Sequence, residues 1–290
     1  MIFLSPECFP CLLRQADVAA RARQATGETR IAIAAAICAM MRDLPSRNEI
    51  PAVTATRVQE LLRDRLGTDD PFGPMKERIL SRFGEMSERA ARLVKGAPDP
   101  WAAAVRLSAF GNILDSGIVE PGAMEQELAS ISPEVREYRL PPRFRERLLS
   151  AESVGVLLDN AGEAAFDLPL LSLLSSNGRK VWIGVKGGPV YDDLTWEDAG
   201  RLGLSAFGEV VSNGNRGVGT ILELCAEPFR ERIAASGMIL SKGQGNFETL
   251  VGQVPNAYYL LRCKCPVVSR AVGRPEGEYL LLDALGGHAE

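Results

Sequence analysis

Apolar residues are spaced differently in the two halves of the chain. Up to about residue 150 they recur at intervals of three and four, with glycines and prolines between the segments, which predicts a succession of helices. The predicted helices are Cys11–Ala25, Thr29–Arg42, Val53–Leu66, Phe72–Glu85, Ser87–Val94, Trp101–Ile113 and Gly122–Ala129. Pro141-Pro142 and the charged stretch after them end this pattern. We therefore expect residues 1–150 to form an all-helical N-terminal region.

From residue 151 onward, short apolar runs alternate with helical patterns. The runs that predict strands are Ser153–Leu158, Val181–Val185, Glu209–Val211 and Met238–Leu240, followed by Tyr258–Arg262, Pro266–Val272 and Glu278–Leu282 in the tail. Helical spacing covers Glu163–Ser175, Thr195–Leu202, Gly219–Ala235 and Phe247–Gln253. This alternation is typical of a parallel sheet covered by helices on both faces. The predicted fold is a three-layer α/β/α, doubly wound, mainly parallel sheet, with a Rossmann-like domain at residues 151–290.

Composition and charge argue against some classes of binding partner. The chain has 33 basic and 37 acidic residues, a net charge of −4 and a pI near 5.4, and the basic residues are not gathered in blocks. Such a chain lacks the basic surface typical of nucleic-acid binding. No apolar run reaches the length of a membrane span or a signal-peptide core. We expect a cytoplasmic protein without nucleic-acid or membrane partners; the sequence leaves the oligomeric state open.

Polar residues follow three of the predicted strands where each strand ends. Asp159 and Asn160 follow the first strand, and Asp193 lies in the loop after the second. The carboxyl ends of parallel strands share one rim of a sheet, where ligands bind. Carboxylate and amide oxygens without histidine suit Mg²⁺ or Mn²⁺, and Co²⁺ or Ni²⁺ remain candidates. The only histidine, His288, lies near the C-terminus, which argues against a histidine triad or a zinc protease.

The third polar cluster suits an anion. Lys242 lies in a Ser-Lys-Gly-Gln-Gly-Asn turn that leads into a predicted helix, and glycine-rich turns of this kind present backbone N–H groups to phosphate. Each candidate also has a structural interpretation. Asp159-Asn160 could form an Asx turn, Asp193 could cap the next helix, and Lys242 could be a solvated turn residue.

Four of the six cysteines are paired near the two ends of the chain. Cys8 and Cys11 form a CxxC motif, and Cys263 and Cys265 are two residues apart. If the ends met, four thiolates could hold a second metal ion with tetrahedral geometry. The alternative is that they are small buried side chains.

The blocks Asp159–Glu163, Lys186–Asp198 and Ser241–Glu248 occur in that order along the chain. Together they resemble the signature blocks of the damage-control phosphatase family, also called domain of unknown function 89. The opening Glu7-Cys8-Phe9-Pro10-Cys11 and the late Lys264-Cys265-Pro266 are similar to its prokaryotic branch with an N-terminal CxxC. The resemblance extends over nearly the whole chain.

The resemblance implies a metal-dependent phosphatase that removes phosphate from small, often damaged phosphometabolites such as sugar phosphates, with residues 151–290 as the catalytic domain. Asp159, Asn160 and Asp193 match the family's metal ligands. Lys242 matches a catalytic, phosphate-contacting lysine, and Glu163 a substrate-site acid. The further predicted substrate-binding residues are Lys186, Gly243, Gln244, Gly245 and Asn246. This chain has Asp192 where the family usually has asparagine, which makes the site more negative.

Two functions of other classes stay open. An S-adenosylmethionine-dependent carboxyl methyltransferase, once proposed within the family, would use the same rim, although no convincing glycine-rich loop follows the first strand. A non-catalytic sensor would bind phosphorylated metabolites without turnover. In the phosphatase hypothesis, the cation binds a phosphoryl oxygen and a water, while Lys242 and the backbone amides of Gly243–Gly245 neutralise charge as the P–O bond breaks. Whether water or an aspartate attacks phosphorus is open.

Overall fold

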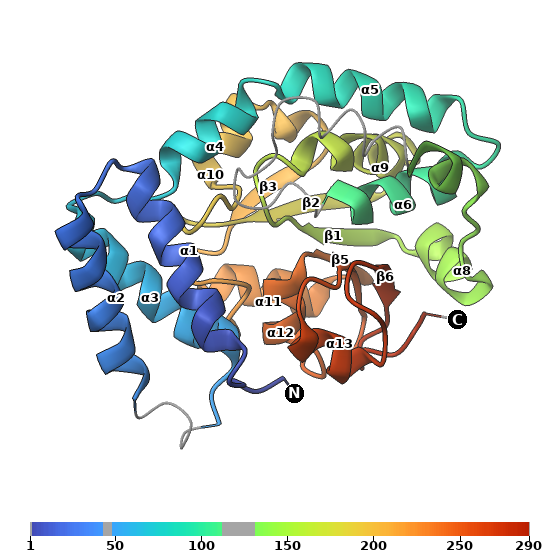
Figure 1. Ribbon diagram of the computed structural model, residues 1–290. Coiled ribbons are helices and arrows are strands. Elements are labelled where there is room, and N and C mark those ends of the chain that lie inside the picture. The colour runs from blue at the N-terminus through green and yellow to red at the C-terminus, as the bar shows by residue number, and fades with distance from the viewer. Residues whose placement is uncertain (1, 43–47, 112–130, 290) are drawn as a thin grey trace.

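The computed structural model describes residues 2–42, 48–111 and 131–289. Its centre is a six-stranded sheet with the strand order β3-β2-β1-β4-β5-β6 (Figure 1). The strands are β1 (Ser153–Leu157), β2 (Lys180–Val185), β3 (Glu209–Ser212), β4 (Met238–Lys242), β5 (Ala257–Arg262) and β6 (Tyr279–Leu282). All neighbouring pairs are parallel except β5 with β6. This is a doubly wound order that reverses direction between β1 and β4, so the predicted fold class is confirmed.

Alternate residues along the strands pack against opposite helical layers. Val154 and Val156 of β1 join one hydrophobic core, whereas Leu157 joins the other. The first layer contains α5 (Phe83–Lys95), α6 (Pro100–Gly111), α8 (Pro142–Ser150), α9 (Ala164–Ser176) and α10 (Trp196–Arg201). The second contains α11 (Glu227–Ala235), α12 (Gln244–Leu250) and α13 (Pro266–Val272) (Figure 1). Within the described ranges, no helix is both long and apolar enough to cross a bilayer.

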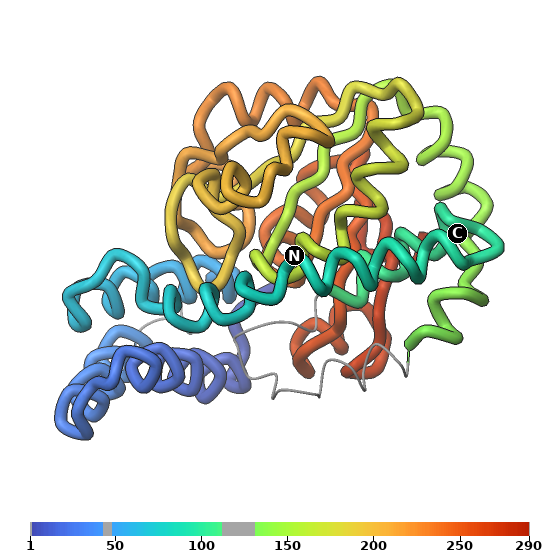
Figure 2. The backbone as a smooth tube through the Cα atoms, turned by 90° about the horizontal axis from the view of Figure 1, so that it is seen from above, coloured from blue at the N-terminus to red at the C-terminus, as the bar shows by residue number. Residues whose placement is uncertain are grey.

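The first helices form a separate core at one side of the sheet. They are α1 (Cys8–Ala22), α2 (Gly27–Met41) and α3 (Pro51–Leu66), joined to the rest by α4 (Gly73–Leu80) (Figures 1 and 2). We call residues 2–75 the N-terminal helical unit. Its core ends at Met75, and from Leu80 onward the helices pack on the sheet. The predicted boundary at residue 150 thus falls just before β1, whereas the hydrophobic cores divide the chain much earlier.

Three predicted segments differ from the structure, and the end of the Trp101–Ile113 helix and the Gly122–Ala129 helix lie outside the described residues. Pro266–Val272 is a helix, not a strand, with Pro266 in its first turn and the left-handed Gly273 (φ 67°) after its end. The helix expected at Gly219–Ala235 begins only at Glu227, directly before Pro228, and a 3₁₀ turn precedes it. The helix expected at Phe72–Glu85 is divided into α4 and α5.

Candidate metal and phosphate site

The segments that follow β1 and β2 pair with each other. Asn160 and Asp193 form an isolated antiparallel bridge. The Leu194 N–H donates to the Asp159 carbonyl at 2.7 Å, and the Ala161 N–H donates to the Asp192 carbonyl at 2.8 Å. These backbone bonds bring the three predicted metal ligands, Asp159, Asn160 and Asp193, into one place.

A cavity of about 300 Å³ lies between these residues and the N-terminal helical unit. Of the predicted catalytic and substrate-binding residues, the cavity is lined by Asp159, Asn160, Asp193, Gln244 and Gly245. Its other polar lining residues include Arg14, Gln15, Tyr191, Asp192, Glu248 and Lys264. Apolar side chains of the helical unit complete the wall, among them Leu12 and Phe72. A volume of this size is at the lower end of the range for small-molecule sites.

Asp192 orients the amide of Asn160. The Asn160 Nδ2 donates to the Asp192 Oδ1 at 2.9 Å, and the Asp192 side chain is buried. This bond turns the nitrogen of the amide toward Asp192, and Oδ1 is the amide atom with the chemistry of a cation ligand. Asp192, the position at which the sequence departs from the pattern it resembles, therefore accepts a hydrogen bond from a predicted ligand.

The electrostatics of Asp159 favour a cation beside it. Burial raises the pKa of the Asp159 carboxyl well above its ordinary value, and the nearby charges of Asp193 and Glu163 raise it further. Gly243, with φ 79°, lets the chain pass so close that a Cβ there would collide with the Asp159 carboxylate. Two carboxylates and an amide oxygen are a donor set that fits Mg²⁺ or Mn²⁺. Among the described residues, no group of three or more histidine, cysteine, aspartate or glutamate side chains could hold a metal, so a cation here would depend on this mixed set.

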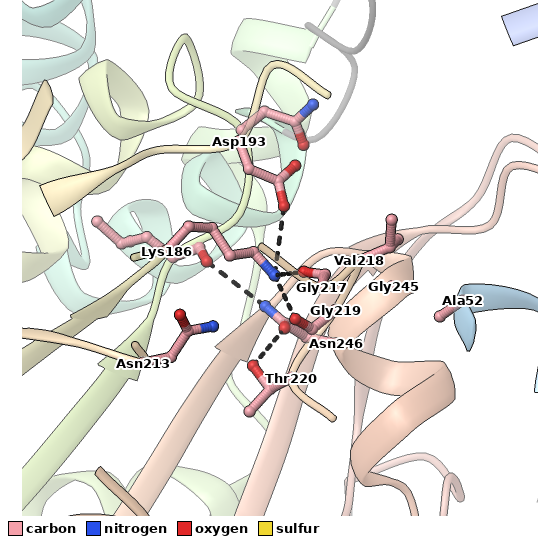
Figure 3. Close-up of polar contacts among 12 residues, drawn as sticks. Ala52, Lys186, Asp193, Asn213, Gly217, Val218, Gly219, Thr220, Gly245 and Asn246 are labelled. Carbon is pink, nitrogen blue, oxygen red and sulfur yellow. Dashed lines mark hydrogen bonds and ion pairs between the residues drawn. The ribbon is translucent and has the colours of Figure 1, made fainter. Parts of the chain in front are cut away.

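Lys186 contacts Asp193 from outside the cavity. Its Nζ lies 3.3 Å from Asp193 Oδ2, donates to the Gly217 carbonyl at 2.9 Å and also contacts the Gly219 carbonyl (Figure 3). The side chain is buried and does not line the cavity. The geometry thus gives no support to the predicted substrate contact, and shows instead that Lys186 joins the loop carrying Asp193 to the glycine-rich loop after β3.

Asn246 is likewise used within the fold. Its Nδ2 donates to the Lys242 carbonyl at 2.8 Å. Its Oδ1 accepts from Thr220 Oγ1 at 2.7 Å (Figure 3). Next to it, Gly219 has φ 69°, and a Cβ there would collide with the Gly245 carbonyl. These contacts fix the first turn of α12 against the loop after β3, so that Gln244 and Gly245 face the cavity while Asn246 does not.

Lys242 and Glu163 lie together in the core beneath the site. The Lys242 Nζ is 3.0 Å from a Glu163 oxygen and 3.0 Å from an Asp167 oxygen, and Ser108 Oγ donates to Asp167 at 2.5 Å. Lys242 and Glu163 are fully buried, and neither lines the cavity. This geometry gives no support to a direct contact between phosphate and either side chain.

The cavity instead contains a lysine that sequence reasoning missed. Lys264 follows β5, lines the cavity, and its charge opposes the rise in the pKa of Asp159. It follows its strand just as Asp159 and Asp193 follow theirs. The rim argument, applied to the predicted strand Tyr258–Arg262, would have found it.

Glu248 is a second missed residue, one turn after Gln244 in α12. Its carboxylate accepts a hydrogen bond from Gln244 Nε2 at 2.9 Å and one from the backbone N–H of Ala52, in the first turn of α3. Burial outweighs both bonds and raises the pKa of Glu248 from 4.5 to about 7. The side chain joins the half that contains the sheet to the N-terminal helical unit.

We expect Glu248→Gln to flatten the pH dependence of stability. A carboxyl whose pKa is raised on folding binds its proton more tightly in the folded state, so wild-type stability should fall as pH rises from 4.5 to about 7. The loss is at most on the order of 3 kcal/mol, because each pKa unit is worth about 1.4 kcal/mol. Urea unfolding at pH 5 and pH 8 measures it. Glu146→Gln, at an exposed carboxylate of α8, is the control; equal slopes for wild type and Glu248→Gln would contradict the prediction.

The segments that carry the two cysteine pairs do lie together, but the four cysteines are not arranged as ligands of one metal ion. Arg270 pairs with Glu7 at 2.8 Å, and Cys8, Cys11 and Cys265 line the cavity. Cys263 is buried in the second core, and none of the four cysteines forms a disulfide. The absence of a metal-holding group of three such side chains in the described part of the chain means that the predicted second metal gains no support.

Comparison with known proteins gives a consistent result. The family model of the damage-control phosphatase ARMT1-like domain matches residues 4–280. Damage-control phosphatase PH1575 of Pyrococcus horikoshii is 31% identical over 93% of this chain and 94% of its own length. A damage-control phosphatase of Archaeoglobus fulgidus is 30% identical over 80% and 82%. The crystal structure of a DUF89 family protein from Pyrococcus horikoshii matches with a TM-score of 0.84 and 28% identity, covering 98% of this chain and all of that one.

Proposed function

The chain belongs to the damage-control phosphatase family with an ARMT1-like domain, and from this premise we propose that it is a metal-dependent phosphatase of small phosphometabolites such as sugar phosphates. The observation that supports this most is the pairing of the segments after β1 and β2, which gathers Asp159, Asn160 and Asp193 on one wall of a cavity of about 300 Å³. A cavity of that size suits a small phosphate ester.

The catalytic contribution of the protein is positioning and charge, as in other phosphoryl transfers. Asp159, Asn160 and Asp193 would hold a divalent cation, which would neutralise negative charge on the phosphoryl group. Asp192 fixes the Asn160 amide, and Lys186 fixes Asp193. The cavity-lining Gln244, Gly245 and Lys264 are the groups proposed to bind the remaining phosphate oxygens. The buried Lys242 with Glu163 would hold α9 against β4 rather than bind substrate.

Removal of metal should abolish phosphate release, and adding it back should restore release. Purified protein is treated with a chelator, desalted, and assayed against p-nitrophenyl phosphate and a panel of sugar phosphates with Mn²⁺, Co²⁺, Ni²⁺ or Mg²⁺. We expect activity in the chelated protein to be at the level of the buffer blank and to return with at least one metal, because the cation stabilises charge that side chains at this site do not.

Three outcomes would contradict this function. Full activity after chelation would exclude metal dependence, and methyl transfer from labelled S-adenosylmethionine would favour the methyltransferase. Tight binding of phosphorylated metabolites with no release under any of the four metals would favour the sensor.

A further inference from the structure

The turn that carries Asp193 contains a residue in an unfavourable backbone conformation. The Asp193 N–H donates to the Val190 carbonyl at 3.1 Å, which closes a four-residue turn, and Tyr191 at its first central position has φ 44°. Positive φ at that position favours glycine, asparagine or aspartate, because a larger side chain crowds its own backbone. A tyrosine persists there only when its surroundings hold it.

Two contacts from the N-terminal helical unit hold Tyr191. Its hydroxyl donates to Gln15 Oε1 of α1 at 2.6 Å. Its ring packs edge-on against Phe72, with ring centroids 5.2 Å apart and an interplanar angle of 73°. Tyr191, Gln15 and Phe72 all line the cavity. The backbone of the aspartate turn is therefore fixed by side chains from the other hydrophobic core.

The same unit also contacts the segments after β3 and β4, and Arg216 of the loop after β3 pairs with Asp69 at 3.0 Å. The Val218 N–H, in the loop after β3, donates to Thr56 Oγ1 of α3 at 2.9 Å. Glu248, after β4, accepts from the Ala52 N–H of α3. Of the residues that make these contacts, Tyr191 is only two residues from a proposed metal ligand, and it is the one with a strained backbone.

We propose that Tyr191 is a positioning residue, through which the N-terminal helical unit holds Asp193 in the geometry that binds the cation. The proposal rests on the metal-dependent function proposed above. Tyr191 need not touch the reacting phosphorus. Its ring and hydroxyl transmit the position of α1 and Phe72 to the turn, and the turn fixes the direction of the Asp193 carboxylate. The helical unit thereby becomes part of the metal site and does more than cover it.

Three substitutions separate the parts of this arrangement. Tyr191→Gly relieves the positive φ but removes both contacts, Tyr191→Phe keeps the ring and loses the hydroxyl, and Gln15→Leu removes the acceptor from the other side. Gln24→Gly is the matched control, since Gln24 has φ 56° in an exposed turn after α1, outside the cavity lining. It relieves the same kind of strain without changing the site.

Mn²⁺ affinity is measured by isothermal titration calorimetry on the intact, metal-free wild type and variants. The unfolding temperature, and kcat and KM for p-nitrophenyl phosphate, are measured on the same proteins. We expect Tyr191→Gly to weaken Mn²⁺ binding about 10- to 100-fold, the usual effect of losing a group that orients a metal ligand. Tyr191→Phe and Gln15→Leu should each weaken Mn²⁺ binding less. The double variant Tyr191→Phe/Gln15→Leu should bind Mn²⁺ as well as either single variant does, because both substitutions remove the same hydrogen bond. Gln24→Gly should bind Mn²⁺ as wild type does.

The results distinguish this proposal from the function on which it rests. If wild type binds Mn²⁺ and releases phosphate, and Tyr191→Gly binds Mn²⁺ equally well, the positioning role is wrong and the phosphatase stands. If the affinity falls only in parallel with the unfolding temperature, Tyr191 is merely structural and the proposal is also overturned. If wild type neither binds a divalent cation nor releases phosphate, both fail together.

Discussion

Replacing Asp159 by alanine is expected to reduce phosphate release about 10³-fold or more and to abolish tight divalent-metal binding, while the protein stays folded. The loss follows because a bound cation contributes several kcal/mol of transition-state charge stabilisation, and each 1.4 kcal/mol is a factor of about ten in rate. Asp159 carries a central part of the proposed donor set, and its carboxylate is packed against Gly243 at the start of α12. Colorimetric phosphate release and Mn²⁺ titration measure the two losses.

The same variant should be at least as stable as wild type when no metal is present. Burial and the charges of Asp193 and Glu163 raise the pKa of Asp159, which means that the ionised carboxylate is costly in the folded state. Replacing the carboxylate by a methyl group removes this unfavourable contribution to the free energy of folding. Residues that serve function often lower stability in this way. Asp64→Ala, at an exposed aspartate of α3, is the control and should change neither activity nor metal binding. Phosphatase activity that survives Asp159→Ala would exclude the metal-ligand assignment.

The sequence was sufficient to predict the sheet and the gathering of three polar side chains at its rim. The strands β1, β2 and β4 are buried on both faces, so their near-continuous apolar runs stand out, and polar residues after them must lie at one rim. That argument led to Asp159, Asn160 and Asp193, which the structure brings together. It needed no knowledge of strand order, because every parallel strand ends at the same rim.

The strand prediction for residues 266–272 was wrong because strand and helix signals compete in this segment. Val267, Val268 and Val272 made residues 266–272 resemble a strand, because β-branched residues favour sheets. The helix signals at its ends, Pro266 and the left-handed Gly273, decided the outcome. The division of the helical half into two cores near residues 75–80 could not be predicted either, because helices of both cores carry the same spacing of apolar residues.

The direction of a side chain at the rim is the least predictable feature. Lys242 is the last residue of β4 and Lys264 follows β5, yet of the two only Lys264 lines the cavity. Lys242 turns toward α9, where Glu163 and Asp167 lie one turn apart, and this depends on how α9 crosses the sheet. Sequence spacing carries no information about such tertiary contacts. The two interpretations of Lys242, a phosphate ligand or a buried ion-pair partner, predict different experimental results.

Replacing Lys242 by methionine is expected to lower the free energy of unfolding by about 3–5 kcal/mol, the usual cost of removing one partner from a buried charge pair. Both carboxyls beside it are fully buried, and burial raises the pKa of each. Burial opposes the charge of Lys242, but Asp167 and Glu163 outweigh it and hold the pKa of the lysine above its ordinary range. Without the lysine, two buried carboxyls lose the cation that both contact. Urea unfolding measures the loss.

A matched variant distinguishes the two interpretations. Lys242→Met combined with Glu163→Gln and Asp167→Asn removes the buried charges together, and replacing a whole buried charge cluster is far less destabilising than breaking it. We therefore expect the triple variant to recover much of the stability, and to recover phosphate release with it, if Lys242 acts only by holding α9 against β4. A single Lys242→Met variant that is as stable as wild type but inactive would instead support the direct phosphate contact suggested by the sequence. In that case the lysine would have to leave Glu163 and Asp167 when substrate binds, because in this structure it is fully buried between them.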